Sequence, residues 1–188
     1  TTVSLTEQKN WTIGFLDKIA DAGVSIFKIE GRGRSEEYVY TTTRAYREAI
    51  DSFRNGTYTK QRITEWKKQL ETVFNRGFWD GYYLGKKTGE WNNEYGSKAT
   101  RRKIYVGKGV KYFDKISVGE FRIEAQSLKV GDDILISGPT TGLIEGNVSE
   151  LRIKDRSEKI AKRGDLVSLP VKSKIRSSDK LYKVVDAG

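Results

Sequence analysis

The chain has 188 residues, of which 36% are apolar, 11% aromatic and 32% charged, which fits one ordinary domain or two small ones. It contains no Cys and no His, which excludes disulfide scaffolds, Cys/His zinc sites, thiolate nucleophiles, His-dependent triads and thiolate-held iron–sulfur clusters. No apolar run is long enough to span a membrane and the first residues lack a signal-peptide core, so we expect a cytoplasmic protein. Chemistry by this chain alone would need carboxylates, Lys, Tyr, Ser, Thr or a metal held by oxygen.

The net charge of +10 is unevenly distributed along the chain. Residues 1–96 carry 15 basic and 13 acidic side chains, whereas residues 97–188 carry 20 basic and 12 acidic ones, a net charge of +8. A basic surface attracts polyanions, and nucleic acid is the commonest of these. The alternative is a generally basic surface that keeps the protein soluble. The chain also lacks Met, which we interpret as a sign of a longer parent protein.

The first elements are a helix and a strand. Residues 12–22 place apolar side chains at helical spacing, and Gly23 follows where a helix C-cap glycine belongs. Residues 24–29 are short, β-branched and alternating, which predicts a strand. A helix followed directly by a strand is the repeating step of a parallel α/β fold.

Two further helices are predicted next, forming a helical hairpin. Ser35 is a good N-cap for a helix that runs to about residue 54. Thr59 caps the following helix, which is expected to end near residue 76. The face of the first helix that we expect to be buried consists of Val39, Ala45, Tyr46, Ala49, Ile50 and Phe53.

The remainder is predicted to be irregular and then β. Residues 77–97 combine Gly with aromatic residues, typical of irregular backbone fixed by large rings. Six short strands without an intervening helix favour a small closed β-barrel, because closure removes exposed edges. The expected strands span about 102–113, 117–126, 132–137, 143–153, 165–171 and 180–185. The fold class is therefore α+β, divided into residues 1–34, 35–96 and 97–188.

The strongest candidate site follows the strand at 24–29. Alternation places Lys28 and Glu30 on one side of that strand, and Arg32 and Arg34 come directly after it. Ligands in parallel α/β folds bind beyond the C-terminal strand ends. A carboxylate flanked by guanidinium groups could bind an anionic substrate or act as an acid or base through Glu30. The alternative is a structural ion-pair cluster. Gly31-x-Gly33 lacks the further residues of a phosphate-binding loop.

Two further candidates involve aromatic and basic residues. Arg76, Trp79 and Tyr82 could form a wall for a ligand or an unstacked base, although interdomain packing is the interpretation we favour. A basic surface on the β part could bind nucleic acid, or could be a set of strand edges that Lys protects from aggregation. Its proposed nucleic-acid-binding residues are Lys98, Arg101, Arg102, Lys103, Lys108 and Lys111.

Three ordered blocks resemble a known family, the collagenase-like proteases, family 32 of the unclassified (U) peptidases. The blocks are FKIEGR at 27–32, AYREA at 45–49, and NRGF at 75–78 followed by GYY at 81–83. The segments GSKATRRKIYVGK, LKVGDDILISGPTTG and SSDKLYKVV resemble the C-terminal extension of this family. The resemblance covers nearly all of the chain.

The resemblance carries implications for fold and cofactor. It implies that residues 1–34 are the last helix–strand step of a β/α-barrel catalytic region, the rest of which is a missing partner. It also implies that the C-terminal β-barrel is similar to the second domain of translation elongation factors. Some members hold an iron–sulfur cluster through cysteines, but the matching position here is Trp11. We therefore expect no cofactor in this chain and no metal site.

Two functions follow from the resemblance. In the first, the chain is the C-terminal part of a collagenase-like peptidase, with Glu30, Arg32 and Lys28 in the active site and Arg34, Arg76, Trp79 and Tyr82 binding substrate. In the second, it is the RNA-binding part of an RNA hydroxylation factor. The expected partner is thus RNA or a protein substrate, not a membrane. In either case we expect no catalysis by this chain alone.

Overall fold

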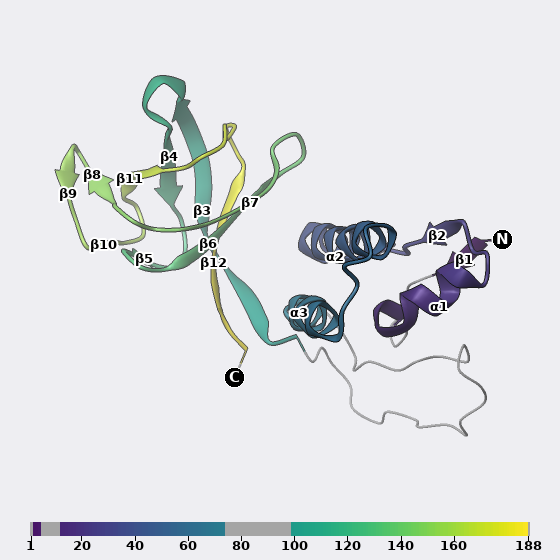
Figure 1. Ribbon diagram of the computed structural model, residues 1–188. Coiled ribbons are helices and arrows are strands. Elements are labelled where there is room, and N and C mark those ends of the chain that lie inside the picture. The colour runs from purple at the N-terminus through teal and green to yellow at the C-terminus, as the bar shows by residue number, and fades with distance from the viewer. Residues whose placement is uncertain (1, 5–11, 74–98, 188) are drawn as a thin grey trace. The chain divides into compact units, whose positions relative to one another are not determined.

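The computed structural model describes residues 2–4, 12–73 and 99–187 of the chain (Figure 1). The chain divides into two compact units, unit 1 (Thr1–Thr100) and unit 2 (Arg101–Gly188). The expected boundary between residues 96 and 97 lies outside the described residues, so the three-part division stays a prediction. Within the described part, no helix is both long and apolar enough to cross a membrane.

Unit 1 begins with the predicted helix–strand step. A 3-10 turn, η1 (Thr12–Phe15), leads into α1 (Leu16–Asp21). Gly23, at φ +83°, ends the helix: its N–H bonds the Ala20 carbonyl, and the next N–H reaches Ile19. This is the Schellman arrangement, in which glycine takes the left-handed position without a Cβ penalty.

The strand after this helix has a partner from the beginning of the chain. β2 (Ile26–Lys28) is shorter than the predicted strand and pairs in parallel with β1 (Thr2–Ser4). The register places Val3 opposite Phe27. The helix–strand step is therefore confirmed, whereas the pairing of β2 with the first residues of the chain was not predicted from the sequence.

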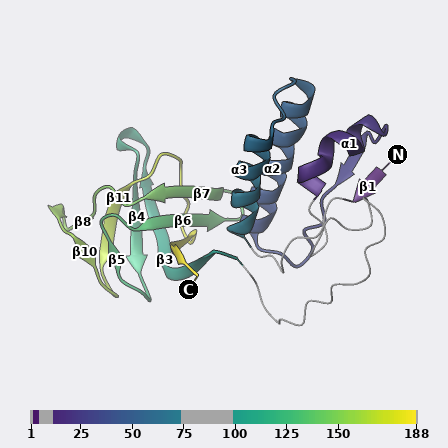
Figure 2. The same ribbon diagram turned by 60° about the horizontal axis from the view of Figure 1, so that its bottom comes forward.

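The helical hairpin consists of α2 (Glu36–Arg54) and α3 (Lys60–Glu71), which lie side by side (Figure 2). Both predicted caps are confirmed, because the Ser35 hydroxyl accepts the Tyr38 N–H and the Thr59 hydroxyl accepts the Arg62 N–H. α3 is shorter than predicted. Its C-cap is Thr72, a β-branched residue whose hydroxyl donates to the Gln69 carbonyl at 2.6 Å and closes the last turn.

The core of unit 1 joins the first helical turns to the hairpin. Its buried members are Ile13, Leu16, Ala45, Tyr46, Ala49, Trp66 and Leu70. Ile50 and Phe53 pack against them half-buried, as expected. Val39 does not, since it is 40% exposed. It continues the apolar stripe into the first turn of α2, beyond the end of the core, where its methyl group lies beside Gly31.

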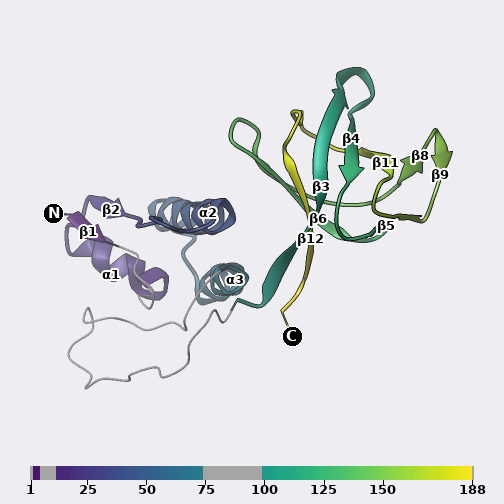
Figure 3. The ribbon, with the colours of Figure 1, turned by 180° about the vertical axis from the view of Figure 1, so that it is seen from behind.

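Unit 2 is a curved, mainly antiparallel sheet, and all six predicted strands are present (Figure 3). The sheet order is β7-β6-β12-β3-β4-β11-β8-β9, with β5 and β10 paired separately. The long strands are β3 (Arg101–Phe113), β4 (Val118–Ile123), β6 (Asp133–Gly138), β7 (Gly142–Asn147), β11 (Leu166–Pro170) and β12 (Lys180–Asp186). The short strands are β5 (Leu128–Lys129), β8 (Arg152–Ile153), β9 (Arg156–Ser157) and β10 (Ile160–Ala161), and η2 (Asp114–Ile116) follows β3.

One predicted strand of unit 2 is wrong in its length. The segment 143–153 ends as a strand at Asn147, because Val148 and Leu151 both turn into the core and break the alternation of a single strand. The pairing order runs from β7 to β9 without joining these two, so full closure into a barrel stays a prediction. Fourteen buried apolar residues, among them Phe121, Val167 and Leu181, fill the concave side of the sheet.

Candidate functional sites

The first candidate site is the short segment after β2. The Lys28 ammonium lies 3.5 Å from one Glu30 carboxylate oxygen, and the other oxygen accepts the Arg32 backbone N–H at 3.1 Å. Glu30 therefore orients both neighbours. The Lys28 side chain is 62% exposed and the Glu30 side chain 35% exposed, so water weakens this ion pair and leaves the groups accessible to a ligand.

A turn fixes the backbone of this segment. The Arg34 N–H donates to the Gly31 carbonyl at 3.0 Å, and Gly33 takes a left-handed φ of +71°. A Cβ on Gly31 would come within 2.8 Å of the Val39 methyl group, so glycine permits the close approach to α2. The Arg34 guanidinium lies 5.7 Å from the Tyr38 ring centroid. The structure thus pairs Lys28 with Glu30, bonds Glu30 to the Arg32 backbone and places the Arg34 guanidinium against Tyr38. The catalytic and substrate-binding roles of these residues stay predictions.

Four further candidate residues lie outside the described residues. They are Arg76, Trp79 and Tyr82 of the aromatic candidate site and Lys98 of the basic surface. In the part of the chain that is described, no group of three or more acidic side chains is arranged to hold a metal ion.

The second candidate site is the predicted basic surface along β3. Lys108 forms a 2.9 Å ion pair with Glu124, the residue that follows β4. The Lys103 ammonium lies 4.9 Å from the Tyr182 ring centroid, and the Lys111 ammonium lies 4.9 Å from that of Phe113. Arg101 and Arg102 are exposed at the start of the strand. Three of the five described residues of this predicted surface therefore already interact with neighbouring side chains.

An aromatic pair lies among these cations. Tyr105 and Tyr182 meet edge to face with their centroids 5.8 Å apart, and the Tyr105 hydroxyl donates to Glu124 at 2.6 Å. Burial and this hydrogen bond raise the pKa of Tyr105 to about 12. Hydrogen bonds from Tyr105 and Lys108 hold the pKa of Glu124 below its ordinary value. Among the cations of β3, this network holds Lys108.

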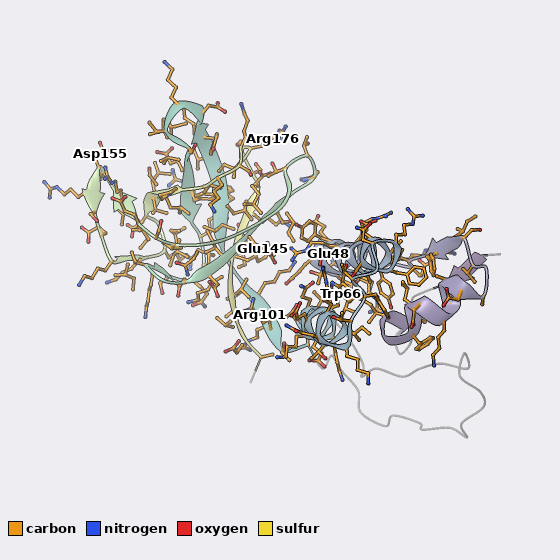
Figure 4. All side chains as sticks on the ribbon, viewed as in Figure 1. Glu48, Trp66, Arg101, Glu145, Asp155 and Arg176 are labelled. Atoms are coloured by element: carbon orange, nitrogen blue, oxygen red, sulfur yellow. The ribbon has the colours of Figure 1, made fainter. Side chains whose placement is uncertain are left out.

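A third basic region was not predicted as a site from the sequence. The hairpin lobe, which we define as residues 150–163, contains β8, β9 and β10. Its basic residues are Arg152, Lys154, Arg156, Lys159, Lys162 and Arg163. Figure 4 shows Asp155 at the outer end of the β8–β9 hairpin. The density of cations between 152 and 163 is the sequence signal that could have identified it.

Comparison with known proteins identifies the family to which the chain belongs. Residues 2–93 match the model of peptidase family U32. The chain is 57% identical over 172 residues to a Porphyromonas gingivalis protein named collagenase, covering 92% of this chain and 42% of that protein. It is 27% identical over 135 residues to tRNA hydroxylation protein P of Haemophilus influenzae, covering 71% of this chain and 27% of that protein.

A solved structure also resembles part of the chain. The C-terminal domain of a U32 peptidase from Geobacillus thermoleovorans matches with a TM-score of 0.40 and 15% identity, covering 42% of this chain and 90% of that domain. The chain spans less than half the length of the curated relatives named above. The family model and the 57% identity to a collagenase together show that this chain belongs to peptidase family U32, as the FKIEGR block predicted.

Proposed function

We propose that this chain is the substrate-binding part of a U32 enzyme and that the substrate it binds is RNA. The observation that carries this proposal is the cation excess of the second half, in which residues 97–188 contain 20 basic and 12 acidic side chains. Such a surface gains affinity for a polyanion by releasing its condensed counterions. The tRNA hydroxylation protein among the relatives supports the choice of RNA.

The two units have different roles in this proposal. Unit 2 is the RNA-binding module, resembling the β-barrel of translation elongation factors. Unit 1 supplies Lys28, Glu30 and Arg32 to an active site whose other residues lie elsewhere in the longer protein. Lys28 is the last residue of the parallel strand β2, and Glu30 and Arg32 follow it. This position supports the proposal, since parallel strand ends are where α/β folds place ligands.

Binding of bulk tRNA by the 188-residue chain across a salt titration tests the RNA part. We expect binding whose affinity falls steeply as salt rises, because each phosphate contact releases about one counterion. Absence of binding at low salt would overturn the proposal. Binding that does not change with salt would do the same, since it would not depend on phosphate contacts.

A second candidate is the collagenase-like peptidase, favoured by the identity to the Porphyromonas collagenase. It makes unit 2 an accessory module for a protein substrate. Digestion of gelatin by the longer protein, beside analysis of modified nucleosides in tRNA from a deletion strain, separates the two candidates. Gelatin cleavage with unchanged tRNA nucleosides would establish the peptidase.

The proposed role of Glu30 is tested in whichever reaction is found. Glu30→Gln keeps the hydrogen-bond acceptor for the Arg32 N–H but removes the charge that attracts Lys28. We expect activity to fall at least tenfold, within the range of general acid–base effects. The matched control is Glu65→Gln on α3, where the carboxylate accepts a hydrogen bond from Gln61 at 3.2 Å. Equal activities of the two variants would exclude Glu30 from the active site.

A further inference from the structure

We propose that the hairpin lobe, rather than the basic surface of β3, is the part of unit 2 that contacts the RNA backbone. This inference rests on the proposed function, in that it assumes RNA binding by unit 2 and identifies the surface responsible.

The cations of the lobe are largely unpaired. The lobe contains six basic and three acidic residues. Arg152 is held by Glu150 at 2.6 Å. The other five cations are exposed, and their side chains form no ion pair or hydrogen bond with the residues that the structure describes. These five are Lys154, Arg156, Lys159, Lys162 and Arg163.

Three of the five described cations of the β3 surface differ in this respect, whereas Arg101 and Arg102 are exposed like the lobe cations. Glu124 already neutralises Lys108, and the ammonium groups of Lys103 and Lys111 lie over aromatic rings. A cation that is already paired must give up that interaction before it binds phosphate, so its net gain is smaller. An unpaired, hydrated cation has no such interaction to give up when it binds phosphate. Five of the six lobe cations are free of such interactions, against two of the five described cations of β3, so the lobe offers more cations that can neutralise phosphate at little cost.

The lobe is exposed at its tip and packed against the core of unit 2 at its base. Ile153 packs against the core of unit 2, whereas residues 154–160 are all exposed. Lys154 and Asp155 form a two-residue turn, both with left-handed φ values of 49° and 63°. This is the geometry of the tight hairpin turns that match the twist of paired strands. The turn thus holds Lys154 and Arg156 at the end of a short, defined hairpin.

The side chains around these cations favour a polyanion over a lipid surface. The tip, residues 154–157, has no apolar side chain, and the lobe exposes a single large apolar residue, Ile160 beside Lys159. Membrane-binding segments instead bring several large apolar groups beside their cations. A simpler explanation of the lobe cations is that they protect the free edge of the sheet from pairing with another chain. However, β9 is only two residues long, and a single Lys is commonly enough to block a short edge, so edge protection does not account for five unpaired cations.

Two triple variants of the 188-residue chain test the proposal. The lobe variant is Lys154→Gln, Arg156→Gln and Lys159→Gln. The matched variant is Arg101→Gln, Arg102→Gln and Lys111→Gln, which removes the same charge from exposed positions of β3. Binding of labelled bulk tRNA is measured from about 50 to 200 mM salt. Circular dichroism is used to check that both variants are folded.

We expect the lobe variant to lose at least about tenfold in affinity and about two to three units of log–log salt slope, with about twofold or less for the β3 variant. The reverse order, or equal losses, would overturn the lobe while leaving RNA binding intact. Tighter binding of phosphatidylglycerol vesicles than of tRNA would also overturn it. If the unaltered chain does not bind tRNA, the proposed function fails and the lobe proposal fails with it.

Discussion

The Tyr105 hydroxyl donates to Glu124 at 2.6 Å, and this bond joins β3 to the residue just after β4, which also binds Lys108. Lys108 binds the other carboxylate oxygen at 2.9 Å, so one acidic side chain orients two neighbours. The two strands pair around a bulge between Gly109 and Lys111. The network thus stabilises β3 next to the point where its register with β4 shifts.

This network predicts how stability changes with pH. Because the folded-state pKa of Glu124 lies below its ordinary 4.5, its contribution is complete above pH 4.5 and is lost as pH falls through the folded value. Tyr105 behaves oppositely: its pKa rises from 10.0 to about 12, so its contribution is complete below pH 10 and is lost as pH rises through about 12. Urea unfolding of Glu124→Gln should show a weaker loss of stability on acidification. The control is Glu145→Gln at an exposed position of β7, and identical acid limbs for the two variants would contradict the network.

We predict that any side chain at Gly107 of β3 lowers the stability of unit 2. A Cβ there would overlap the Arg122 carbonyl oxygen and lie 3.1 Å from the Ile123 Cα, both backbone atoms that can move only with β4. We expect Gly107→Ala to lower the free energy of unfolding by about 2–3 kcal/mol, as for other overpacked sites. Gly146→Ala is the control, since its Cβ would meet only the Ile134 side chain at an ordinary 3.8 Å. Chemical denaturation that gives equal losses for both would refute the steric argument.

A buried hydrogen bond in unit 1 gives a third prediction. The hydroxyls of Tyr46 and Thr12 lie 3.0 Å apart and link α2 to η1, and the two residues are only 3% and 0% exposed. Burial raises the pKa of Tyr46 to about 12. Tyr46→Phe should cost about 1–3 kcal/mol, because the Thr12 hydroxyl loses its partner. Tyr40→Phe, at a 43% exposed position on the same helix, should cost almost nothing.

A double variant distinguishes the lost hydrogen bond from a packing effect. Adding Thr12→Val to Tyr46→Phe removes the unsatisfied hydroxyl. We therefore expect the double variant to be less destabilised than the sum of the two single variants. Additive losses would show that the pair is not coupled.

The local elements could be predicted from the sequence because their signals lie within a few residues. Ser35 and Thr59 cap their helices through bonds to N–H groups three positions later, and Gly23 ends α1 by its own backbone conformation. The strands of unit 2 follow from alternation and turn residues in the same way. None of these predictions needed knowledge of the tertiary fold.

The errors arose where distant residues decide the outcome. Val39 has the right spacing for the buried face of α2. Nothing in the local pattern shows that the core does not extend to the first turn of this helix, where Val39 lies. Val148 and Leu151 look like part of a strand, yet both turn inward to fill the core. The pairing of β1 with β2 joins segments more than twenty residues apart, which periodicity does not detect.

The candidate sites show the same division. Lys28, Glu30 and Arg32 alternate within five positions, so they could be predicted to lie close together. In the structure, Glu30 pairs with Lys28 and accepts the Arg32 backbone N–H. The pairing of Lys108 with Glu124 depends on strand register across a bulge and could not be foreseen. The hairpin turn of the lobe was not predicted, because Lys-Asp lacks the Gly or Asn that usually signals two left-handed residues.

That turn gives the last prediction. Lys154 and Asp155 both adopt left-handed φ values, which costs non-glycine residues on the order of 1 kcal/mol each. Replacing the pair with Asn-Gly should raise the free energy of unfolding by about 1 kcal/mol, because these residues adopt that conformation readily. Net charge is unchanged, since one cation and one anion are lost together. The control is Ser157→Gly on β9, which lacks a left-handed φ and should lose about 0.5–1 kcal/mol through the greater freedom of its unfolded state. Stabilisation by both substitutions would show that the turn is not strained.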